Sequence, residues 1–345
     1  MKIFLDDSLC KENLVPLSLT RNVSSFRIGI LTIKEKWELL SGASIEISAP
    51  ENNDTIKIPA NFLPNQENFN IIINSIQHNN PIANEELIKS IKFPWQIFQW
   101  NEFAIKDDFK LITQNRKSAE LSKTNQIIGN TNDIFIEGGV QAEHCIFNTT
   151  NGPIYIGKHS TIMEGSMIRG PFAILENSVV KMGSKIYGAT TIGPNCVVGG
   201  EIKNSVIFEN SNKAHDGYLG DSVIGAWCNL GAGTSNSNVK NTGGEVKYQI
   251  QNNAIPISCG FKGGLIIGDY SRCAINTSFN TGTVIGVCCN IFGSNYPDKY
   301  VDHFSWGGER YIFEKALKDI DNWKKMKNQS LTDSEIHTLK QIFKK

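Results

Sequence analysis

The sequence lacks an excess of either charge, and this argues against a large class of partners. Lysine plus arginine and aspartate plus glutamate both number 34 in 345 residues, so the formal net charge is zero. Nucleic acids and anionic membranes are bound by clustered basic surfaces. No apolar run approaches the roughly 18 residues that a membrane-spanning helix needs. The opening "MKIFLDDSLC" meets two aspartates after three apolar residues, unlike a secretory signal. We therefore expect neither nucleic acid nor membrane as a partner.

Paired cysteine motifs are also missing. Eight cysteines are scattered along the chain, and none forms the Cys-x-x-Cys pair typical of structural zinc sites, so we expect no metal site. A chain of this length does not need disulfides to fold. We expect free, mostly buried thiols, as in a protein of the reducing cytoplasm.

A period of six residues is the strongest pattern that is present. Eight successive positions, each six residues after the last, are β-branched and apolar: Ile156, Ile162, Ile168, Ile174, Val180, Ile186, Ile192 and Val198. The period resumes at Ile224 and Leu230, and again from Ile267 to Ile291. A spacing of six fits neither an α-helix nor a long flat strand. It favours a parallel β-helix over a β-sandwich, because three six-residue units close one triangular coil and stack the apolar residues inside.

This repeat resembles the hexapeptide acyltransferase family. The resemblance implies a left-handed β-helix and a homotrimer with active sites between neighbouring subunits. We expect a mainly β protein with three parts. A small N-terminal α/β region covers 1–125, the β-helix domain covers 126–310, and C-terminal helices cover 311–345. The segment 235–264 lacks the repeat and reads as an inserted loop. Thr332 and Glu335 match a capping box at the start of a C-terminal helix.

The strict register also breaks around 199–223, next to a histidine. The stretch "AHDGYLGDSVIGAWCNLGAGT" (214–234) carries His-x-x-Tyr-Leu-Gly-Asp followed by Asn-Leu-Gly-Ala-Gly-Thr. It resembles the acetyltransferase half of the bifunctional glucosamine-1-phosphate acetyltransferase/N-acetylglucosamine-1-phosphate uridylyltransferase family. The specific match runs from Glu201 to Thr234. The whole chain also resembles a group of bacterial proteins, common in the Bacteroidetes, with a shortened N-terminal domain.

The resemblance implies acetyl transfer from acetyl-CoA to an amino-sugar phosphate or a nucleotide amino sugar. His215 falls on the catalytic base, and Glu201 falls on a carboxylate near that base. An imidazole suits this role at neutral pH, because it can take the proton of the attacking amine. The resemblance also implies substrate contacts for Lys203, Tyr218, Asn229, Asn238, Lys185 and Lys262, and acetyl-CoA contacts for the backbone at Ala232 and Gly293. Ile275 departs from the family, which has a serine there.

The N-terminal region resembles the family's other half, a nucleotidylyltransferase, in a shortened form. In "VPLSLTRNVSSFRIG" (15–29), Pro16, Leu17, Thr20 and Arg21 match, whereas Asn22-Val23 replaces Pro-Lys. The glycine-rich loop that would cradle a triphosphate is missing before it. We expect magnesium to be a cofactor only if nucleotidyl transfer survives here.

Three hypotheses follow from the sequence. The first is an N-acetyltransferase with His215 as general base. The second is a sugar-1-phosphate nucleotidylyltransferase that transfers a uridylyl or thymidylyl group, supported by the "PLSLTR" segment. The third is a non-catalytic trimeric assembly protein, which Ile275 and the altered nucleotidyl motif would allow.

Overall fold

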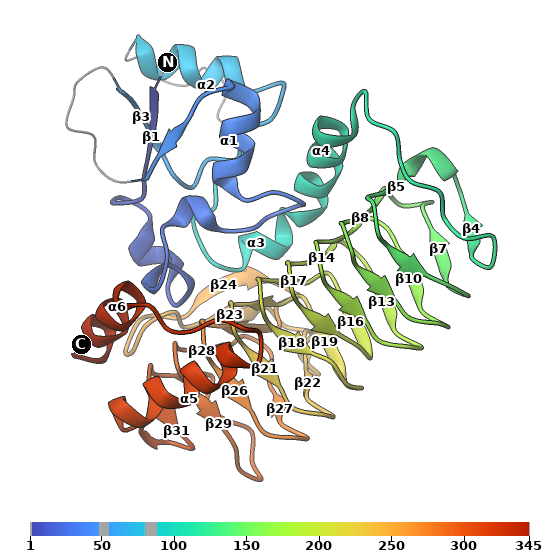
Figure 1. The fold of residues 1–345 in the computed structure, drawn as a ribbon. Coiled ribbons are helices and arrows are strands. Elements are labelled where there is room, and N and C mark those ends of the chain that lie inside the picture. The colour runs from blue at the N-terminus through green and yellow to red at the C-terminus, as the bar shows by residue number, and fades with distance from the viewer. Residues whose placement is uncertain (1, 48–54, 79, 81–87, 345) are drawn as a thin grey trace.

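The computed structural model describes residues 2–47, 55–78, 80 and 88–344, and it is dominated by a left-handed parallel β-helix. Figure 1 shows the coils stacked along one axis, with the N-terminal region lying along one side and the C-terminal helices near the far end. The sequence-based prediction of a mainly β fold with hexapeptide repeats is confirmed.

Three parallel sheets form the faces of the β-helix. Face 1 has the order β19-β16-β13-β10-β7-β4, and its strands are β4 (Gln126–Ile128), β7 (Ile146–Asn148), β10 (Met167–Arg169), β13 (Lys185–Tyr187), β16 (Glu201–Lys203) and β19 (Tyr218–Gly220). Beyond β19, the pair β22 (Ser235–Asn236) and β27 (Ser278–Phe279) continues it, since the Asn236 side chain accepts a hydrogen bond from the Gly220 amide at 2.9 Å.

The other two faces are longer. Face 2 contains β5 (Ile134–Ile136), β8 (Ile154–Ile156), β11 (Phe172–Ile174), β14 (Thr190–Ile192), β17 (Val206–Ile207), β20 (Val223–Ile224), β25 (Leu265–Ile267), β28 (Thr283–Ile285) and β30 (Tyr300–Val301). Face 3 contains β6 (Gln141–Ala142), β9 (Thr161–Ile162), β12 (Val179–Val180), β15 (Val197–Val198), β18 (Asn212–Lys213), β21 (Asn229–Leu230), β26 (Arg272–Cys273), β29 (Asn290–Ile291), β31 (Ser305–Trp306) and β32 (Glu309–Arg310).

The apolar positions of the six-residue period fill the interior of the β-helix. None of the eight side chains from Ile156 to Val198 is more than 1% exposed, and all belong to one buried cluster. Their spacing puts one on each face in turn, so each stacks on the equivalent side chain of the next coil. The coils also continue through 199–223, because Ile202, Ile207 and Leu219 keep the interior filled at slightly irregular spacing.

The N-terminal region is a three-stranded parallel sheet with helices. The sheet has the order β2-β1-β3, with β1 (Lys2–Asp6), β2 (Ile45–Glu46) and β3 (Thr55–Pro59). The helices are α1 (Ile33–Ser41), α2 (Phe69–Gln77), α3 (Gln96–Gln99) and α4 (Asn101–Thr113). Helix α1 begins at a capping box formed by Thr32 and Glu35.

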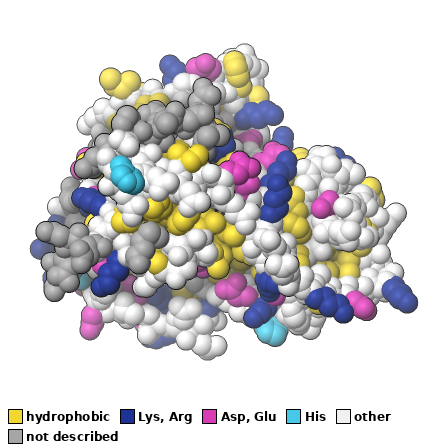
Figure 2. Space-filling view, turned by 90° about the horizontal axis from the view of Figure 1, so that it is seen from above, with side chains coloured by type: hydrophobic (Ala, Val, Ile, Leu, Met, Phe, Trp, Pro, Cys, Tyr) yellow, Lys and Arg dark blue, Asp and Glu magenta, His cyan; other side chains and the backbone are white. Residues whose placement is uncertain are grey.

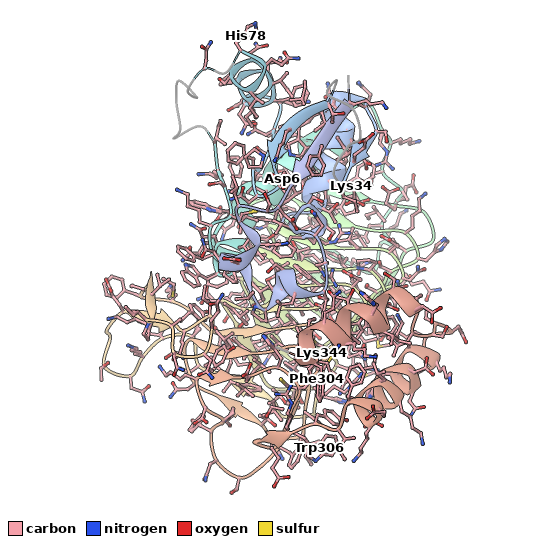
Figure 3. All side chains as sticks on the ribbon, turned by 90° about the vertical axis from the view of Figure 1, so that its left-hand side faces the viewer. Asp6, Lys34, His78, Phe304, Trp306 and Lys344 are labelled. Carbon is pink, nitrogen blue, oxygen red and sulfur yellow. The ribbon has the colours of Figure 1, made fainter. Side chains whose placement is uncertain are left out.

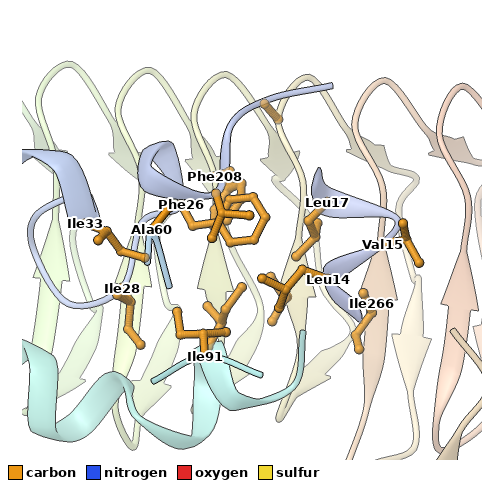
Figure 4. Close-up of a cluster of buried hydrophobic side chains, with 14 of the residues drawn as sticks. Leu14, Val15, Leu17, Phe26, Ile28, Ile33, Ala60, Ile91, Phe208 and Ile266 are labelled. Carbon is orange, nitrogen blue, oxygen red and sulfur yellow. The ribbon is translucent and has the colours of Figure 1, made fainter. Parts of the chain in front are cut away.

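This region shares its core with face 2. Phe26 packs on Phe208 with ring centroids 5.9 Å apart, and the outward side chains Val206, Val223 and Ile266 of face 2 lie in the same buried cluster as Leu14 and Leu17 (Figure 4). The N-terminal region therefore covers the apolar outside of face 2, and this side of the β-helix is not open to solvent.

The expected inserted loop is partly structured. Ser235 and Asn236 pair with β27, and the remainder contains an antiparallel hairpin of β23 (Val246–Tyr248) and β24 (Ile257–Gly260). Tyr248 is buried and stacks on Trp95, with ring centroids 5.1 Å apart. The segment does not project freely, because this aromatic contact holds it against the N-terminal region.

The C-terminal part contains α5 (Phe313–Lys325) and α6 (Asp333–Lys344). The predicted capping box is confirmed, since the Glu335 amide donates to the Thr332 hydroxyl at 3.3 Å and the Thr332 amide donates to the Glu335 carboxylate at 2.9 Å. Phe304 packs on Phe343 of α6, and Figure 3 shows Phe304, Trp306 and Lys344 close together at this end.

The surface carries charges of both signs (Figure 2), as expected from a net charge of zero, and the cysteines are free thiols. Figure 2 shows basic and acidic side chains interspersed on the face seen from above. Among the residues that the structure describes, no helix combines the length and the apolar character needed to cross a bilayer. All eight cysteines are free; seven are buried and Cys259 is half-buried.

Candidate functional site

His215 lies on an exposed corner of the β-helix between face 3 and face 1. Residues 214–217 connect β18 to β19, and the His215 imidazole makes no hydrogen bond within the described part of the chain. Gly217 has a φ of +120°, and a Cβ there would lie 2.1 Å from the Thr234 carbonyl oxygen of the next coil. Only glycine fits this corner, which leaves the histidine ring facing outward on a tightly packed backbone.

Lys213 lies directly beneath this corner, inside the β-helix. It occupies the interior position that Val198 and Leu230 occupy in the adjacent coils, and it is 1% exposed. Its ammonium donates to the backbone carbonyls of Gly199, at 3.2 Å, and of His215. Burial lowers the pKa of Lys213 to about 8, although the charge of Asp216 works in the opposite direction. The sequence analysis missed Lys213; the available signal was a charged residue at an interior register position.

Replacing Lys213 with methionine is expected to remove a pH dependence of stability. The pKa of Lys213 lies below its ordinary value of 10.5, so between pH 8 and 10.5 the unfolded chain binds the extra proton. The free energy of unfolding of the wild type should therefore rise, relative to Lys213→Met, as the pH rises through this range, by about 3 kcal/mol at most.

Thermal unfolding of both proteins at pH 7.5 and 9.5 measures this difference. The exposed Lys158, changed to methionine in the same way, is the control and should show no such trend. Equal pH dependence in the wild type and Lys213→Met would contradict the burial of a titrating ammonium.

Glu201 and Lys203 lie side by side on the outside of face 1, joined by a tyrosine that the sequence analysis also missed. The Tyr187 hydroxyl donates to the Glu201 carboxylate at 2.6 Å, and the Lys203 ammonium lies 5.9 Å from the centroid of the Tyr187 ring. The hydrogen bond to Glu201 raises the pKa of Tyr187 to about 12. Tyr187 thus orients the carboxylate and keeps its own proton at neutral pH.

Tyr218, Asn238 and Lys262 gather at the next coil around a buried carboxylate. Asp221 is 2% exposed and accepts hydrogen bonds from the side-chain amides of Asn204, at 2.6 Å, and Asn238, at 2.5 Å. Burial raises the pKa of Tyr218, which lies opposite Glu201 in the register of β16 and β19. The Gly263 amide donates to the Asn238 carbonyl at 2.9 Å and brings the exposed Lys262 beside this group.

Lys185 and Asn229 differ in their distance from this cluster, because Lys185 lies on face 1 and Asn229 lies on face 3. Lys185 is exposed and lies opposite Glu201 on face 1. Asn229 lies on face 3, where its side-chain oxygen is 3.5 Å from the Asn212 amide and where Lys327, just after α5, reaches Asn212. The structure therefore brings Lys185 to the cluster but separates Asn229 from it by one corner of the coil.

Ala232, Ile275 and Gly293 follow His215 along the same corner in successive coils. The Gly233 amide donates to the Asp216 carbonyl at 3.0 Å, and the Asn276 amide donates to the Ala232 carbonyl at 2.6 Å. Ile275 is 69% exposed. Gly293 lines a cavity of about 600 Å³ with Phe292, Tyr296 and His303. These corners form an open path that leads from His215 toward the C-terminal end of the β-helix.

Arg21 of the N-terminal segment forms a buried ion-pair cluster with two carboxylates of the β-helix. Its guanidinium donates to Asp269 at 2.6 and 3.1 Å and to Glu209 at 2.8 Å, and it lies over the Phe208 ring. Burial works against its charge, but the two carboxylates raise the pKa of Arg21. The Thr20 hydroxyl donates to the same Asp269 oxygen at 2.7 Å, so the segment is fixed to the β-helix.

The carboxylate at the end of β1 belongs to Asp6, in the region that resembles a nucleotidylyltransferase. The Asp6 carboxylate accepts from the amide and hydroxyl of Ser8 and pairs with Lys57 at 2.8 Å. Within the described ranges, no group of three or more His, Cys, Asp or Glu side chains is placed to hold a metal ion. In this structure the Asp6 carboxylate is therefore engaged by Ser8 and Lys57.

The comparisons with known proteins match separate parts of the chain. Residues 2–89 match the sugar nucleotidyl transferase family. The resemblance of the N-terminal region to a nucleotidylyltransferase is thereby confirmed. This match ends before the first strand of the β-helix.

Curated relatives combine two activities in their names. The chain is 34% identical over 128 residues to the bifunctional protein GlmU of Methanococcus maripaludis, covering 36% of this chain and 29% of the relative. It is 32% identical over 130 residues to that of Methanocaldococcus jannaschii, covering 36% and 31%. The bifunctional sugar-1-phosphate nucleotidylyltransferase/acetyltransferase of Sulfurisphaera tokodaii is 39% identical over 92 residues, covering 27% and 23%. The matches span about a quarter to a third of each of these relatives.

Proposed function

We propose that the protein is an N-acetyltransferase that uses acetyl-CoA to acetylate an amino-sugar phosphate or a nucleotide amino sugar. The observation that carries the proposal is the exposed imidazole of His215 at the corner that leads into face 1, where Glu201, Lys203 and Tyr218 lie on adjacent strands. The name of the Sulfurisphaera tokodaii relative, which includes an acetyltransferase, supports it. In this proposal the N-terminal region takes no part in the reaction and covers the apolar outside of face 2.

In this reaction, His215 acts as general base. Neutral imidazole takes a proton from the amine as the nitrogen attacks the thioester carbonyl and the C–N bond forms. The C–S bond then breaks, and the imidazolium returns the proton to the departing sulfur. The backbone amide of Ala232, one coil further along the corner, stabilises the negative charge on the carbonyl oxygen.

The remaining residues position the two substrates. Lys203 and Lys185 bind the acceptor phosphate, because each presents a cation on face 1. Tyr218, Asn238 and Lys262 line the acceptor sugar, and Glu201 stabilises the imidazolium of His215. The acetyl-CoA chain follows the corner past Ala232 to Gly293, where the 600 Å³ cavity accepts its far end.

A homotrimer completes the site in this proposal. Asn229 lies on face 3, and it contacts an acceptor only if a neighbouring copy brings its own face 1 opposite this face. Light scattering during gel filtration should then give about three times the mass of the 38.3 kDa chain. The free thiols fit a cytoplasmic location.

Nucleotidyl transfer is the second candidate, and the match of residues 2–89 favours it. The burial of Arg21 between Asp269 and Glu209 opposes it, since that guanidinium is already neutralised. Release of pyrophosphate from UTP or dTTP with a sugar 1-phosphate would identify this activity. A third candidate, a non-catalytic assembly protein, predicts binding of neither CoA nor sugar phosphate in calorimetry.

The direct test is to mix the protein with acetyl-CoA and an amino sugar and to follow the free thiol of CoA. Glucosamine 1-phosphate, galactosamine 1-phosphate and their nucleotide-linked forms are the acceptors to try. We expect thiol release that requires both substrates. Absence of turnover with every amino sugar would reject the acetyltransferase.

A further inference from the structure

A groove lies on the outside of face 1, next to the candidate site and on the side away from the C-terminus. It has a volume of about 460 Å³ and is lined by side chains of the consecutive strands β4, β7, β10 and β13. Its lining includes Ile128, Met167, Arg169, Lys185 and Tyr187. Its volume lies within the range of small-molecule sites.

Two cations in this groove lack partners. Arg169 and Lys185 are both exposed, and in the part of the chain that the structure describes neither makes an ion pair or a side-chain hydrogen bond. Arg21 and Arg116, in contrast, each pair with a carboxylate. The face of the groove thus offers unneutralised positive charge on two adjacent coils, which favours a ligand with more than one phosphate charge.

The wall beside these cations is apolar. Met167 is 45% exposed and Ile128 is 41% exposed, which is high for large apolar side chains in a folded protein. The Tyr187 ring borders the same hollow and is held by its hydrogen bond to Glu201. A flat, weakly polar group can pack against such a surface, whereas a second phosphate or a free sugar gains little there.

The groove is continuous with the proposed acceptor site. Tyr187 pairs in register with Lys203, and Lys185 pairs with Glu201, so the groove begins one coil from the residues that bind the acceptor. Coils are about 4.8 Å apart, and three steps from β16 to β7 span about 14 Å. This length accommodates a diphosphate followed by a nucleoside.

We propose that this groove binds the nucleoside diphosphate of the acceptor, so that the substrate is a nucleotide-linked amino sugar and not an amino-sugar 1-phosphate. This inference rests on the proposed acetyltransferase function. The sugar lies at His215 and Tyr218, the first phosphate lies at Lys203, the second phosphate lies between Lys185 and Arg169, and the base packs against Met167 and Ile128.

Arg169→Gln is the decisive variant, because Arg169 lies outside the acetyl-transfer residues and its side chain is exposed. Binding of uridine diphosphate and thymidine diphosphate, measured by calorimetry, should weaken about tenfold in Arg169→Gln. The value of kcat/KM should fall about tenfold for uridine diphosphate glucosamine and stay unchanged for glucosamine 1-phosphate. Lys158→Gln, an exposed cation at the corner between face 2 and face 3, is the control and should change neither quantity.

Failure of this inference can be told apart from failure of the proposed function. Equal kcat/KM for the two acceptors, with no effect of Arg169→Gln, would overturn the nucleotide site and leave the acetyltransferase standing. No acetylation of either acceptor, with uridine diphosphate still bound through Arg169, would overturn the proposed function and leave the groove standing only as a nucleotide-binding site. A change of oligomeric state in Met167→Glu, with no nucleotide binding by the wild type, would show that the groove is a contact between copies.

Discussion

Replacing His215 with alanine is expected to lower kcat for acetyl transfer by about 10²–10⁴-fold, the usual contribution of a general base. The amine must lose its proton during attack, and His144, which lies on the same edge of the β-helix between β6 and β7, is several coils away from His215. Because His215 is exposed and makes no side-chain hydrogen bond in the described structure, its removal should leave the melting temperature unchanged. Release of CoA thiol at saturating substrate measures the loss.

The division of the effect between kcat and KM separates a base from a binding group. A base is needed for the chemical step, so the loss in His215→Ala should appear in kcat at saturating substrate, whereas loss of a binding group would appear mainly in KM. His159 is the matched control, since it is also an exposed corner histidine, with a φ of +56° that asparagine tolerates. We expect His159→Asn to behave as the wild type. Undiminished turnover in His215→Ala would remove it from the mechanism.

Replacing Arg21 with methionine is expected to reduce the free energy of unfolding by about 3–5 kcal/mol, the cost of breaking a buried ion pair on one side. The Asp269 side chain is 2% exposed and would remain charged without its main partner. Burial alone would raise the pKa of Glu209, but Arg21 outweighs it and holds that pKa below its usual value. Chemical denaturation, monitored by tryptophan fluorescence, measures the loss.

The same substitution should loosen the N-terminal region from face 2. Limited proteolysis is expected to release it faster in Arg21→Met, whereas Lys106→Ala, which breaks an exposed pair with Glu102, should change stability by about 0.5 kcal/mol at most. Adding Asp269→Asn to Arg21→Met should recover part of the loss, because the uncompensated charge is then absent. A stability equal to that of the wild type would show that the contact does not hold the two parts together.

The register of the β-helix could be predicted because it is a local property. The coils bury a side chain at every sixth position, so the eight interior residues spaced six apart from Ile156 to Val198 can be predicted from spacing alone. The register shifts after Val198, and in the shifted register Ile207 and Leu219, each six residues from Lys213, mark that lysine as an anomaly. Its meaning is visible only in the fold, where the ammonium reaches the carbonyls of Gly199 and His215.

The partners of the candidate residues could not be predicted in the same way. Tyr187 precedes Glu201 by 14 residues, and only the stacking of coils puts its hydroxyl on that carboxylate. Asn229 belongs to the same sequence motif as His215, yet the turn of the coil moves it to face 3. Motif spacing thus gives the order of residues along the chain, whereas the corners of the β-helix decide which of them share a surface.

The sequence by itself determined the β-helix and its interior residues from Ile156 to Val198, because a period of six residues fits the coils of a parallel β-helix. Only the tertiary structure decided what the N-terminal segment does with Arg21. Arg21 matches a nucleotidylyltransferase segment in the sequence, but in the fold its guanidinium pairs with Asp269, which lies 248 residues away. Long-range pairing of charges leaves no periodic trace in a sequence, since it depends on which surfaces meet after the coils have formed.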